Sequence, residues 1–315
     1  MTHPPAPAQH YEEQYLDLMR RVWDKGDARV DRTGVGTRSL FGEQLRFDLS
    51  DGRIPLLTTK RVYWKAAARE LLWFLSGESN IRPLVAQNVH IWTDWPLDHY
   101  RRVTDEAIDR DAFEARILAD DDFAARWGDL GPVYGVQWRK WPRYVPAGDG
   151  LYSRDPEGID QMAALVHSLK SNPASRRHLF TGWNVAELDG MALPPCHMTY
   201  QFHVTEAGGL SCLLFQRSCD VALGLPFNLF AAALLTAMLA QQTGLAPREL
   251  IWSGGDVHLY QNHAELVREQ LARRPAGDPR LTLGAAPPSL FDYRIDDVFI
   301  RDYAPQEHIR APVAV

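Results

Sequence analysis

The sequence predicts an α+β fold: a single domain with one large mixed β-sheet flanked by helices. Residues 197–220 form two strand patterns around a Gly-rich turn, which indicates an antiparallel hairpin. Residues 225–242 follow as a long apolar stretch, which indicates a buried core helix. Other strand and helix patterns continue along the chain with no convincing linker. We therefore expect one domain over residues 11–315, preceded by a disordered tail at 1–10.

The first elements follow from residue periodicity. Apolar residues at helical spacing predict an amphipathic helix over 11–25, and alternation predicts a strand over 39–49. The intervening Gly-rich loop at 31–37 is a weak phosphate signal, and a plain turn is equally consistent with it. Strong helix formers predict a helix over 64–76 with an apolar face around Glu70. A lone Glu is usually solvated, but if Glu70 is buried its pKa rises and it can act as a general acid or base.

The middle of the chain is less regular. Trp92 and Trp95 serve either the core or a platform for a flat heterocycle. Residues 97–127 are charge-dense and helix-prone, which indicates a surface insertion. Residues 142–158 are rich in Pro, Gly and Asp, and we expect a loop there.

The C-terminal half is predicted from the same patterns. They indicate a helix over 159–170, a strand over 178–183, the buried helix over 225–242 and a strand over 293–300. Arg176 and Arg177 can meet one anion only where the chain is irregular, because adjacent side chains on a strand point to opposite faces. An unpartnered surface pair is the alternative. His258 and Tyr260 share one face if their segment is extended.

Composition excludes several classes of protein. The 315 residues are 45% hydrophobic and 23% charged, as in an ordinary globular protein, and the net charge of −6 argues against a nucleic-acid coat protein. Three cysteines indicate a reducing, cytoplasmic environment, and the N-terminus lacks the apolar region of a secretory signal. The apolar run 225–239 is too short and too polar to span a membrane.

Cys196 is the candidate nucleophile. The predicted hairpin brings Cys196 near Arg217, and an adjacent guanidinium favours the reactive thiolate. Pro194 and Pro195 interrupt the preceding segment, so the cysteine is expected at the end of an element. Burial as a small hydrophobe is the ordinary alternative for a cysteine, and it suits Cys212 and Cys219 better. No pair has the spacing of a zinc site.

Nine motifs resemble those of the thymidylate synthase family along nearly the whole chain, in the same order and spacing. They are DRTGVGT, RELLWFL, NVHIWTDW, GDLGPVYGVQWR, SRRH, LPPCH, FQRSCDVALGLPFN, GGDVHLY and RAPVAV. The resemblance implies reductive methylation of dUMP to dTMP, with 5,10-methylenetetrahydrofolate supplying both carbon and hydride and leaving as dihydrofolate. It implies no metal, nicotinamide or flavin, and no membrane or nucleic-acid partner.

The resemblance also implies roles for individual residues. Cys196 would add to carbon 6 of the pyrimidine, and the acid/base network would comprise Glu70, Asn228, Tyr134, His197 and Asp220. The dUMP site would comprise Arg32, Gln216, Arg217, Ser218, Asp220, Asn228, His258 and Tyr260, with Arg176 and Arg177 from the second subunit of a two-fold dimer whose sheets pack back to back. The folate site would comprise Lys60, Ile91, Trp92, Trp95, Leu193, Asp220, Leu223, Gly224, Phe227, Ala314 and Val315. Lys60 would lie near the acidic tail, and the C-terminus would close over the ligands.

Three other functions are consistent with part of the pattern. A deoxycytidylate hydroxymethylase shares the fold, but Asn228 can donate to uracil O4 and accept from N3–H, whereas an aspartate would suit cytosine better. A Cys–His hydrolase leaves Asp220, Asn228 and the phosphate arginines without a purpose. A non-catalytic nucleotide-binding protein has no need of Cys196.

Overall fold

The computed structural model describes residues 10–30 and 34–311. The helices are α1 (Glu13–Lys25), α2 (Trp64–Ser76), α3 (Arg82–Val85), α4 (Asp94–Thr104), α5 (Arg110–Ala119), α6 (Asp121–Trp127), α7 (Tyr134–Arg139), α8 (Gln161–Ser171), α9 (Gly224–Thr243) and α10 (Ala264–Ala272). The strands are β1 (Asp27–Arg29), β2 (Thr37–Asp48), β3 (Trp141–Gly148), β4 (Leu151–Ile159), β5 (Leu179–Thr181), β6 (His197–Val204), β7 (Gly209–Asp220), β8 (Ala246–Tyr260), β9 (Arg280–Leu283) and β10 (Val298–Arg301). Short 3₁₀ turns are η1 (Ser50–Gly52), η2 (Leu188–Gly190), η3 (Gln261–His263), η4 (Leu290–Asp292) and η5 (Ile295–Asp297).

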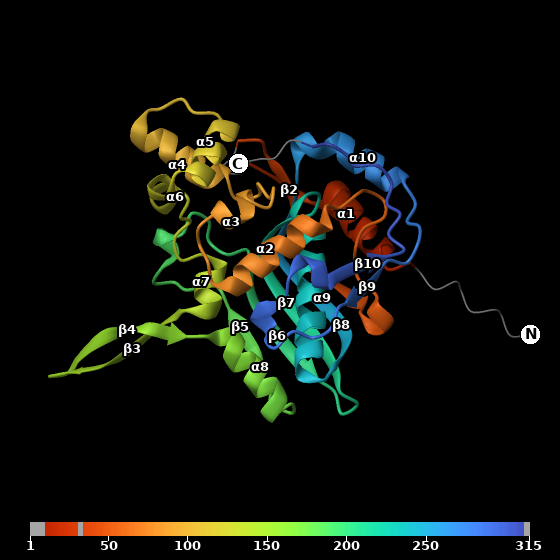
Figure 1. The fold of residues 1–315 in the computed structure, drawn as a ribbon. Helices are drawn as coiled ribbons and strands as arrows, with labels where there is room; N and C mark the ends of the chain where they lie inside the picture. Colours follow the sequence, from red (N-terminus) through yellow and green to blue (C-terminus); the bar gives the residue numbers. More distant parts are fainter. Residues whose placement is uncertain (1–9, 31–33, 312–315) are drawn as a thin grey trace, which may run out of the picture.

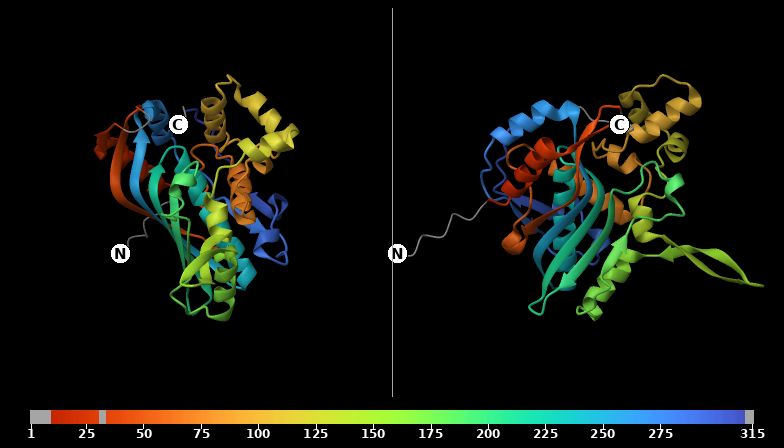
Figure 2. Two further views of the ribbon diagram at one scale, coloured as in Figure 1. Left: turned by 90° about the vertical axis from the view of Figure 1, so that its left-hand side faces the viewer. Right: turned by 180° about the vertical axis from the view of Figure 1, so that it is seen from behind.

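A six-stranded sheet in the order β1-β2-β8-β7-β6-β5 organises the molecule. β7 and β8 are parallel and the other neighbours are antiparallel, so the predicted mixed sheet is confirmed. Helix α9 packs on β7 and β8, and α2 packs on α9, so the helices form layers over one face of the sheet (Figure 1). Seen from behind, the strands face the viewer with these helices beyond them (Figure 2).

The face of the sheet away from α9 carries exposed apolar side chains. The strand register places Leu179, Leu213 and Phe215 on one face, opposite the fully buried Cys212 and Leu214. Leu179 is 46% exposed and Phe215 is 40% exposed. This face therefore bears exposed apolar side chains beside polar ones such as Gln201, and no described helix covers those apolar side chains.

Helix α9 confirms the predicted buried helix almost residue for residue. Its backbone ends at Gly244, whose φ of +71° is the left-handed geometry that favours glycine. It is the one described helix long and apolar enough to cross a membrane, and 72% of that window is buried inside the protein. Its apolar length therefore serves the core.

The predicted hairpin is also confirmed. β6 and β7 pair antiparallel with His197 opposite Gln216, so residues 196 and 217 lie at adjacent ends of the two strands. The backbone N–H of Arg217 donates to the carbonyl of Cys196 at 2.9 Å. The sheet therefore fixes the two candidate catalytic groups beside each other.

The predicted loop over 142–158 is wrong, because β3 and β4 form an antiparallel hairpin there. It projects from the body as a two-stranded ribbon (Figures 1 and 2). Register shifts near Pro142 and Pro146 absorb their missing N–H groups, which a ribbon with two free edges tolerates. Ile159 belongs to β4, so the helix predicted from that residue begins at Gln161 instead.

The predicted strand over 293–300 is only partly correct, because η5 occupies its centre and β10 begins at Val298.

The predicted surface insertion at 97–127 contains most of α4 together with α5 and α6, which pack around their own aromatic cluster. Within it the ring centroids of Tyr100 and Trp127 lie 4.9 Å apart.

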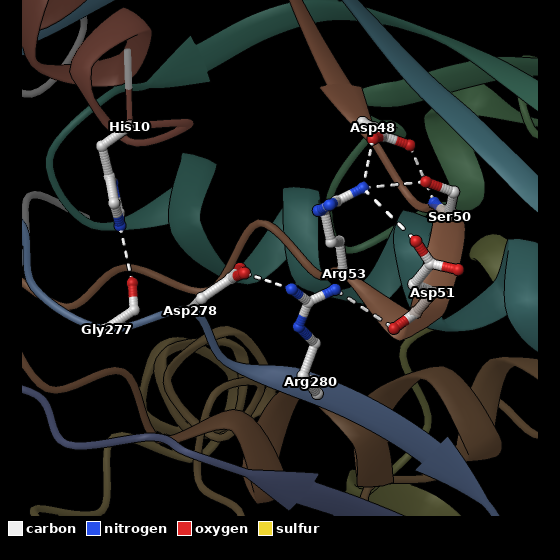
Figure 3. A network of polar contacts seen from close by, with 8 residues as sticks. All are labelled: His10, Asp48, Ser50, Asp51, Arg53, Gly277, Asp278 and Arg280. Atoms are coloured by element: carbon white, nitrogen blue, oxygen red, sulfur yellow. Dashed lines mark hydrogen bonds and ion pairs between the residues drawn. The ribbon is translucent and has the colours of Figure 1, made fainter. Parts of the chain in front are cut away.

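Polar contacts join β9 to the η1 turn beneath the sheet (Figure 3). Arg53 donates to Asp48 at 2.6 Å and to Ser50 at 2.9 Å, while Arg280 pairs with Asp278 and donates to the carbonyl of Asp51 at 3.2 Å. Exposed pairs of this kind each contribute little stability. They define how the small β9–β10 sheet sits against the main sheet, away from the cavity described next.

Candidate active site

A cavity of about 400 Å³ opens where the parallel strands β7 and β8 end side by side. Its lining residues are Arg29, Val30, Thr37, Trp95, Leu193, Cys196, Arg217, Ser218, Asp220, Asp256, His258 and Tyr260. Eight of the predicted site residues are among them. The sheet therefore gathers, in one place, side chains that are far apart in the sequence.

Cys196 lies at the start of β6, partly exposed, and its thiol faces this cavity. The Arg217 guanidinium approaches it, with Nη2 3.9 Å from Sγ. The same guanidinium donates to the carbonyls of Pro195 at 2.9 Å and Pro194 at 2.8 Å. The two prolines therefore fix the arginine as well as interrupting the strand.

The other two cysteines are fully buried in the core. Burial raises the pKa of the Cys212 thiol to about 12, opposed by hydrogen bonding with Thr236, and it raises the pKa of Cys219 well above the ordinary range. A neutral buried thiol is a poor nucleophile. Cys196 is thus the reactive candidate of the three.

Tyr134 and Glu70 are buried ionisable groups in the region of Cys196. The backbone N–H of Cys196 donates to the phenol oxygen of Tyr134 at 2.7 Å, and burial raises the pKa of that phenol well above its ordinary value. Glu70, from α2, accepts a hydrogen bond from Trp92 Nε1 at 2.8 Å. Burial raises the pKa of Glu70 to about 7, so this carboxyl can give or take a proton near neutrality.

Replacing Glu70 by Gln should change how stability depends on pH. The unfolded carboxyl titrates near 4.5 and the folded one near 7, so between these values the folded protein retains a proton that the unfolded chain has lost. The stabilisation from this group is complete below about pH 4.5 and is lost as the pH rises through 7. We expect the unfolding free energy of the wild type, minus that of Glu70→Gln, to fall by up to about 3 kcal/mol from pH 4.5 to 8.

Urea unfolding at a series of pH values measures this difference. Glu265→Gln is the control, because that side chain is 85% exposed and the difference should stay flat. A flat difference for Glu70→Gln as well would show that Glu70 titrates as an ordinary solvated carboxyl.

A second polar chain orients Asn228. Trp252 Nε1 donates to Gln216 Oε1 at 2.9 Å, and Gln216 Nε2 donates to Asn228 Oδ1 at 2.9 Å. The Asn228 amide is thereby held in one orientation, with His197 as a second hydrogen-bonding neighbour. His197 is buried, and burial, opposed by hydrogen bonding with Asn228, lowers its pKa to about 4, so the ring is neutral at pH 7.

Asp220 is the last residue of β7 and lies four residues before the start of α9 at Gly224. Its Oδ1 accepts hydrogen bonds from the backbone N–H groups of Ala222 at 2.8 Å and Leu223 at 3.3 Å. This leaves Oδ2 for a ligand. Nearby, Leu223, Gly224 and Phe227 are half-buried, and Trp95 and Leu193 line the cavity.

The remaining predicted folate residues differ in accessibility. Trp92 is 4% exposed and bonded to Glu70, so it belongs to the core beneath Trp95, whose ring centroid lies 5.1 Å away. Ile91 is 38% exposed. Lys60 is 4% exposed and its ammonium donates to the carbonyl of Ala222, so it points inward.

The phosphate residues lie in two places. Arg217 and Ser218 line the cavity, as do the strand neighbours His258 and Tyr260. Arg176 and Arg177 are exposed in an irregular segment before β5 and do not line it. Arg32, Ala314 and Val315 lie outside the described residues.

Sequence reasoning missed several residues of the site, among them the cavity-lining Val30 and Thr37. Asp256 lines the cavity and its Oδ1 lies 3.1 Å from His258 Nδ1; its position two residues before His258 on a strand could have revealed it. Arg29 also lines the cavity. The Arg217 guanidinium lies over the Trp183 ring, with its Cζ 5.3 Å from the ring centroid. Trp252 holds Gln216. These three have no local signal, because only the fold brings them to the site.

Comparison with known proteins gives a consistent result. The family model described as Thymidylate synthase matches residues 13–315. A protein named Thymidylate synthase from Sphingopyxis alaskensis is 71% identical over 306 residues, covering 97% of this chain and 98% of that protein. Proteins of the same name from Novosphingobium aromaticivorans and Rhizorhabdus wittichii are 66% and 64% identical, covering 97% and 98% of this chain and 97% and 99% of their own length.

Proposed function

The chain belongs to the thymidylate synthase family and is a methyltransferase that converts dUMP to dTMP, and we propose that it does so through a covalent bond between Cys196 and pyrimidine carbon 6. The family uses 5,10-methylenetetrahydrofolate as its cosubstrate. The observation that carries the proposal is the position of the Cys196 thiol, which faces the cavity 3.9 Å from Arg217. A cation at this distance stabilises a thiolate.

Carbon 5 of uracil is a poor nucleophile, and addition of the thiolate to carbon 6 makes it reactive. When sulfur bonds to carbon 6, the electron pair of the 5,6 double bond moves toward O4, and the resulting enolate makes carbon 5 nucleophilic. Carbon 5 then bonds to the methylene carbon of the folate and later loses its proton. The bond between the methylene carbon and the folate nitrogen then breaks, which leaves an exocyclic methylene on carbon 5 and frees tetrahydrofolate. The methylene takes a hydride from that folate and becomes the methyl group, and expulsion of the thiolate from carbon 6 restores the 5,6 double bond. The products are dTMP, dihydrofolate and the free thiolate.

The buried groups suit the proton transfers of this sequence. Glu70 titrates near neutrality, so it can serve as the acid that assists opening of the folate ring and as a relay for the carbon 5 proton. Neutral His197 and the oriented Asn228 amide support hydrogen bonding at the pyrimidine edge. Tyr134 holds the Cys196 backbone.

We assign nucleotide and folate contacts from the cavity. Arg217 and Ser218, with Arg32, would bind the phosphate, and His258 and Tyr260 would bind the ribose hydroxyl. Asp220 Oδ2 would accept from the pterin, whose ring would lie against Trp95 and Leu193. Leu223, Gly224, Phe227 and Ile91 would form the rest of the wall, and Ala314 and Val315 would close it.

A two-fold dimer would complete the phosphate site, with Arg176 and Arg177 contributed by the second subunit. Two observations support it. Both arginines are exposed and outside the cavity of their own chain, and the sheet exposes the large apolar side chains Leu179 and Phe215 on one face. Packing two such faces back to back would bury them.

Mixing two inactive variants tests this shared site. Cys196→Ser lacks the nucleophile, and the double change Arg176→Ala with Arg177→Ala lacks the arginines that serve the partner. In a mixed dimer, one of the two sites combines an intact cysteine with intact arginines. After subunit exchange at equal concentrations we expect about one quarter of wild-type activity, because half of the dimers are mixed. Activity no higher than the sum of the separate variants would contradict the exchange of arginines.

The activity itself is tested by spectrophotometric formation of dihydrofolate with dUMP, dCMP or UMP as acceptor. We expect turnover with dUMP, loss with dCMP because the Asn228 edge is mismatched, and loss with UMP because of its 2′-hydroxyl. The low cysteine content, three in 315 residues, also supports a cytoplasmic location.

A further inference from the structure

A buried carboxylate lies outside the cavity and has no part in the mechanism above. Glu12 precedes α1 and is 0% exposed. Its Oε2 accepts from Thr58 N at 2.8 Å and Thr58 Oγ1 at 2.7 Å, and its Oε1 accepts from Thr59 N at 2.9 Å and from the Thr59 hydroxyl. Two backbone amides and two hydroxyls therefore converge on the two carboxyl oxygens. Glu12 therefore fixes the backbone and side chains of residues 58 and 59.

The next residue along the chain is the buried cation Lys60. Its ammonium donates to the carbonyl of Ala222, in the turn that leads into α9. Burial lowers the pKa of Lys60 to about 8, and the charges of Asp220 and Glu12 oppose this by stabilising the ammonium. The ammonium is therefore within electrostatic reach of both Glu12 and Asp220.

The turn at 221–223 connects this pair to the site. Asp220 Oδ1 accepts from the N–H groups of Ala222 and Leu223, so movement of the turn moves the carboxylate. The turn is also held by Tyr15, whose hydroxyl donates to the carbonyl of Val221 at 2.8 Å. Glu12 is thus joined to Asp220 by hydrogen bonds to Thr59, the peptide bond from Thr59 to Lys60, and hydrogen bonds of Ala222 with Lys60 and Asp220.

We infer that Glu12 and Lys60 are positioning residues for the folate cosubstrate, which act as one unit by holding the 220–223 turn. The inference rests on the proposed function, in which Asp220 and Leu223 contact the pterin. It differs from the expectation that Lys60 meets the acidic tail of the folate, because that ammonium is committed to an internal carbonyl. Preorganising the turn would lower the ordering cost of cosubstrate binding.

A double-mutant cycle tests whether the two residues act together. We expect Glu12→Gln and Lys60→Met each to raise KM for methylenetetrahydrofolate about tenfold, since each leaves buried groups unsatisfied. The Kd for dUMP should change less than about twofold. The double variant should resemble either single variant, because removing one member already releases the turn.

Three further measurements distinguish a positioning role from other roles. With 5,10-methylenetetrahydropteroate, which lacks the glutamate tail, the Lys60→Met effect should persist. Leu18→Ala, a buried apolar change on α1, should lower stability without altering KM for the folate. Glu12→Asp keeps the carboxylate, so its KM for methylenetetrahydrofolate should lie closer to the wild-type value than the KM of Glu12→Gln. A loss of packing alone would not explain that difference.

Three results would overturn the inference: fully multiplicative effects in the double variant, loss of the Lys60→Met effect with the tail-less cosubstrate, or a change in KM for Leu18→Ala as large as for Glu12→Gln. Wild-type turnover of dUMP is measured in the same assay. Failure of the proposed function would therefore appear as absent wild-type activity, whereas failure of this inference would leave that activity intact.

Discussion

Cys196→Ser is expected to lower kcat by at least about 10³-fold while dUMP still binds with a Kd within about threefold of wild type. Serine keeps the size and the polar character of the side chain but is a far weaker nucleophile at carbon 6. The phosphate and ribose contacts do not involve the sulfur, so the affinity for dUMP should survive. Dihydrofolate formation measures kcat, and titration calorimetry measures Kd.

Cys212→Ala is the matched control for this change. Cys212 is also a free cysteine of the hairpin, but it is fully buried and does not line the cavity. Its removal should lower stability through lost packing and leave kcat within about twofold. More than about a tenth of wild-type kcat in Cys196→Ser would contradict the covalent mechanism.

Asn228→Asp is expected to reverse the choice of pyrimidine. Gln216 Nε2 donates to Asn228 Oδ1 and so orients the amide, whose nitrogen donates to uracil O4 in the proposed complex. A carboxylate in its place accepts from the amino group of cytosine and repels O4. A site built to hydrogen-bond one ring leaves groups unsatisfied with the other, so kcat/KM for dUMP should fall at least about 100-fold and dCMP should become the preferred ligand.

Competition between dUMP and dCMP for binding and turnover measures this preference. Asn228→Ala is the control, since it removes the amide without adding a charge. It should weaken discrimination without reversing it. Continued preference of Asn228→Asp for dUMP would show that the amide is not the group that distinguishes the two rings.

The parts of the fold that were predictable from sequence are those set by local pattern. The helix over 64–76 and the helix ended by Gly244 depend on periodicity and on a terminal glycine, which act within one segment. The β3–β4 hairpin was not predictable in this way, because Pro146 and Gly148 have the composition of a loop. Only a projecting ribbon, which has two free edges, accommodates such residues in strands.

The same distinction applies to the site. Cys196 and Arg217 could be paired from sequence, because a single hairpin joins them. Burial of Glu70 could only be stated as a condition, and the structure fulfils it through packing against Trp92. Glu12 gave no signal at all: a glutamate near the N-terminus looks solvated until the fold places Thr58 and Thr59 around it. Tertiary contacts, which no local pattern reports, create its role.

The covalent claim is tested most directly with 5-fluoro-dUMP and methylenetetrahydrofolate. Fluorine at carbon 5 cannot leave as a proton does, so the reaction should stop with nucleotide and folate both attached to the enzyme. Mass spectrometry of the intact protein should then show one stoichiometric adduct, and the digested protein should carry it on Cys196. An unmodified protein under saturating conditions, or an adduct on any other residue, would contradict the account.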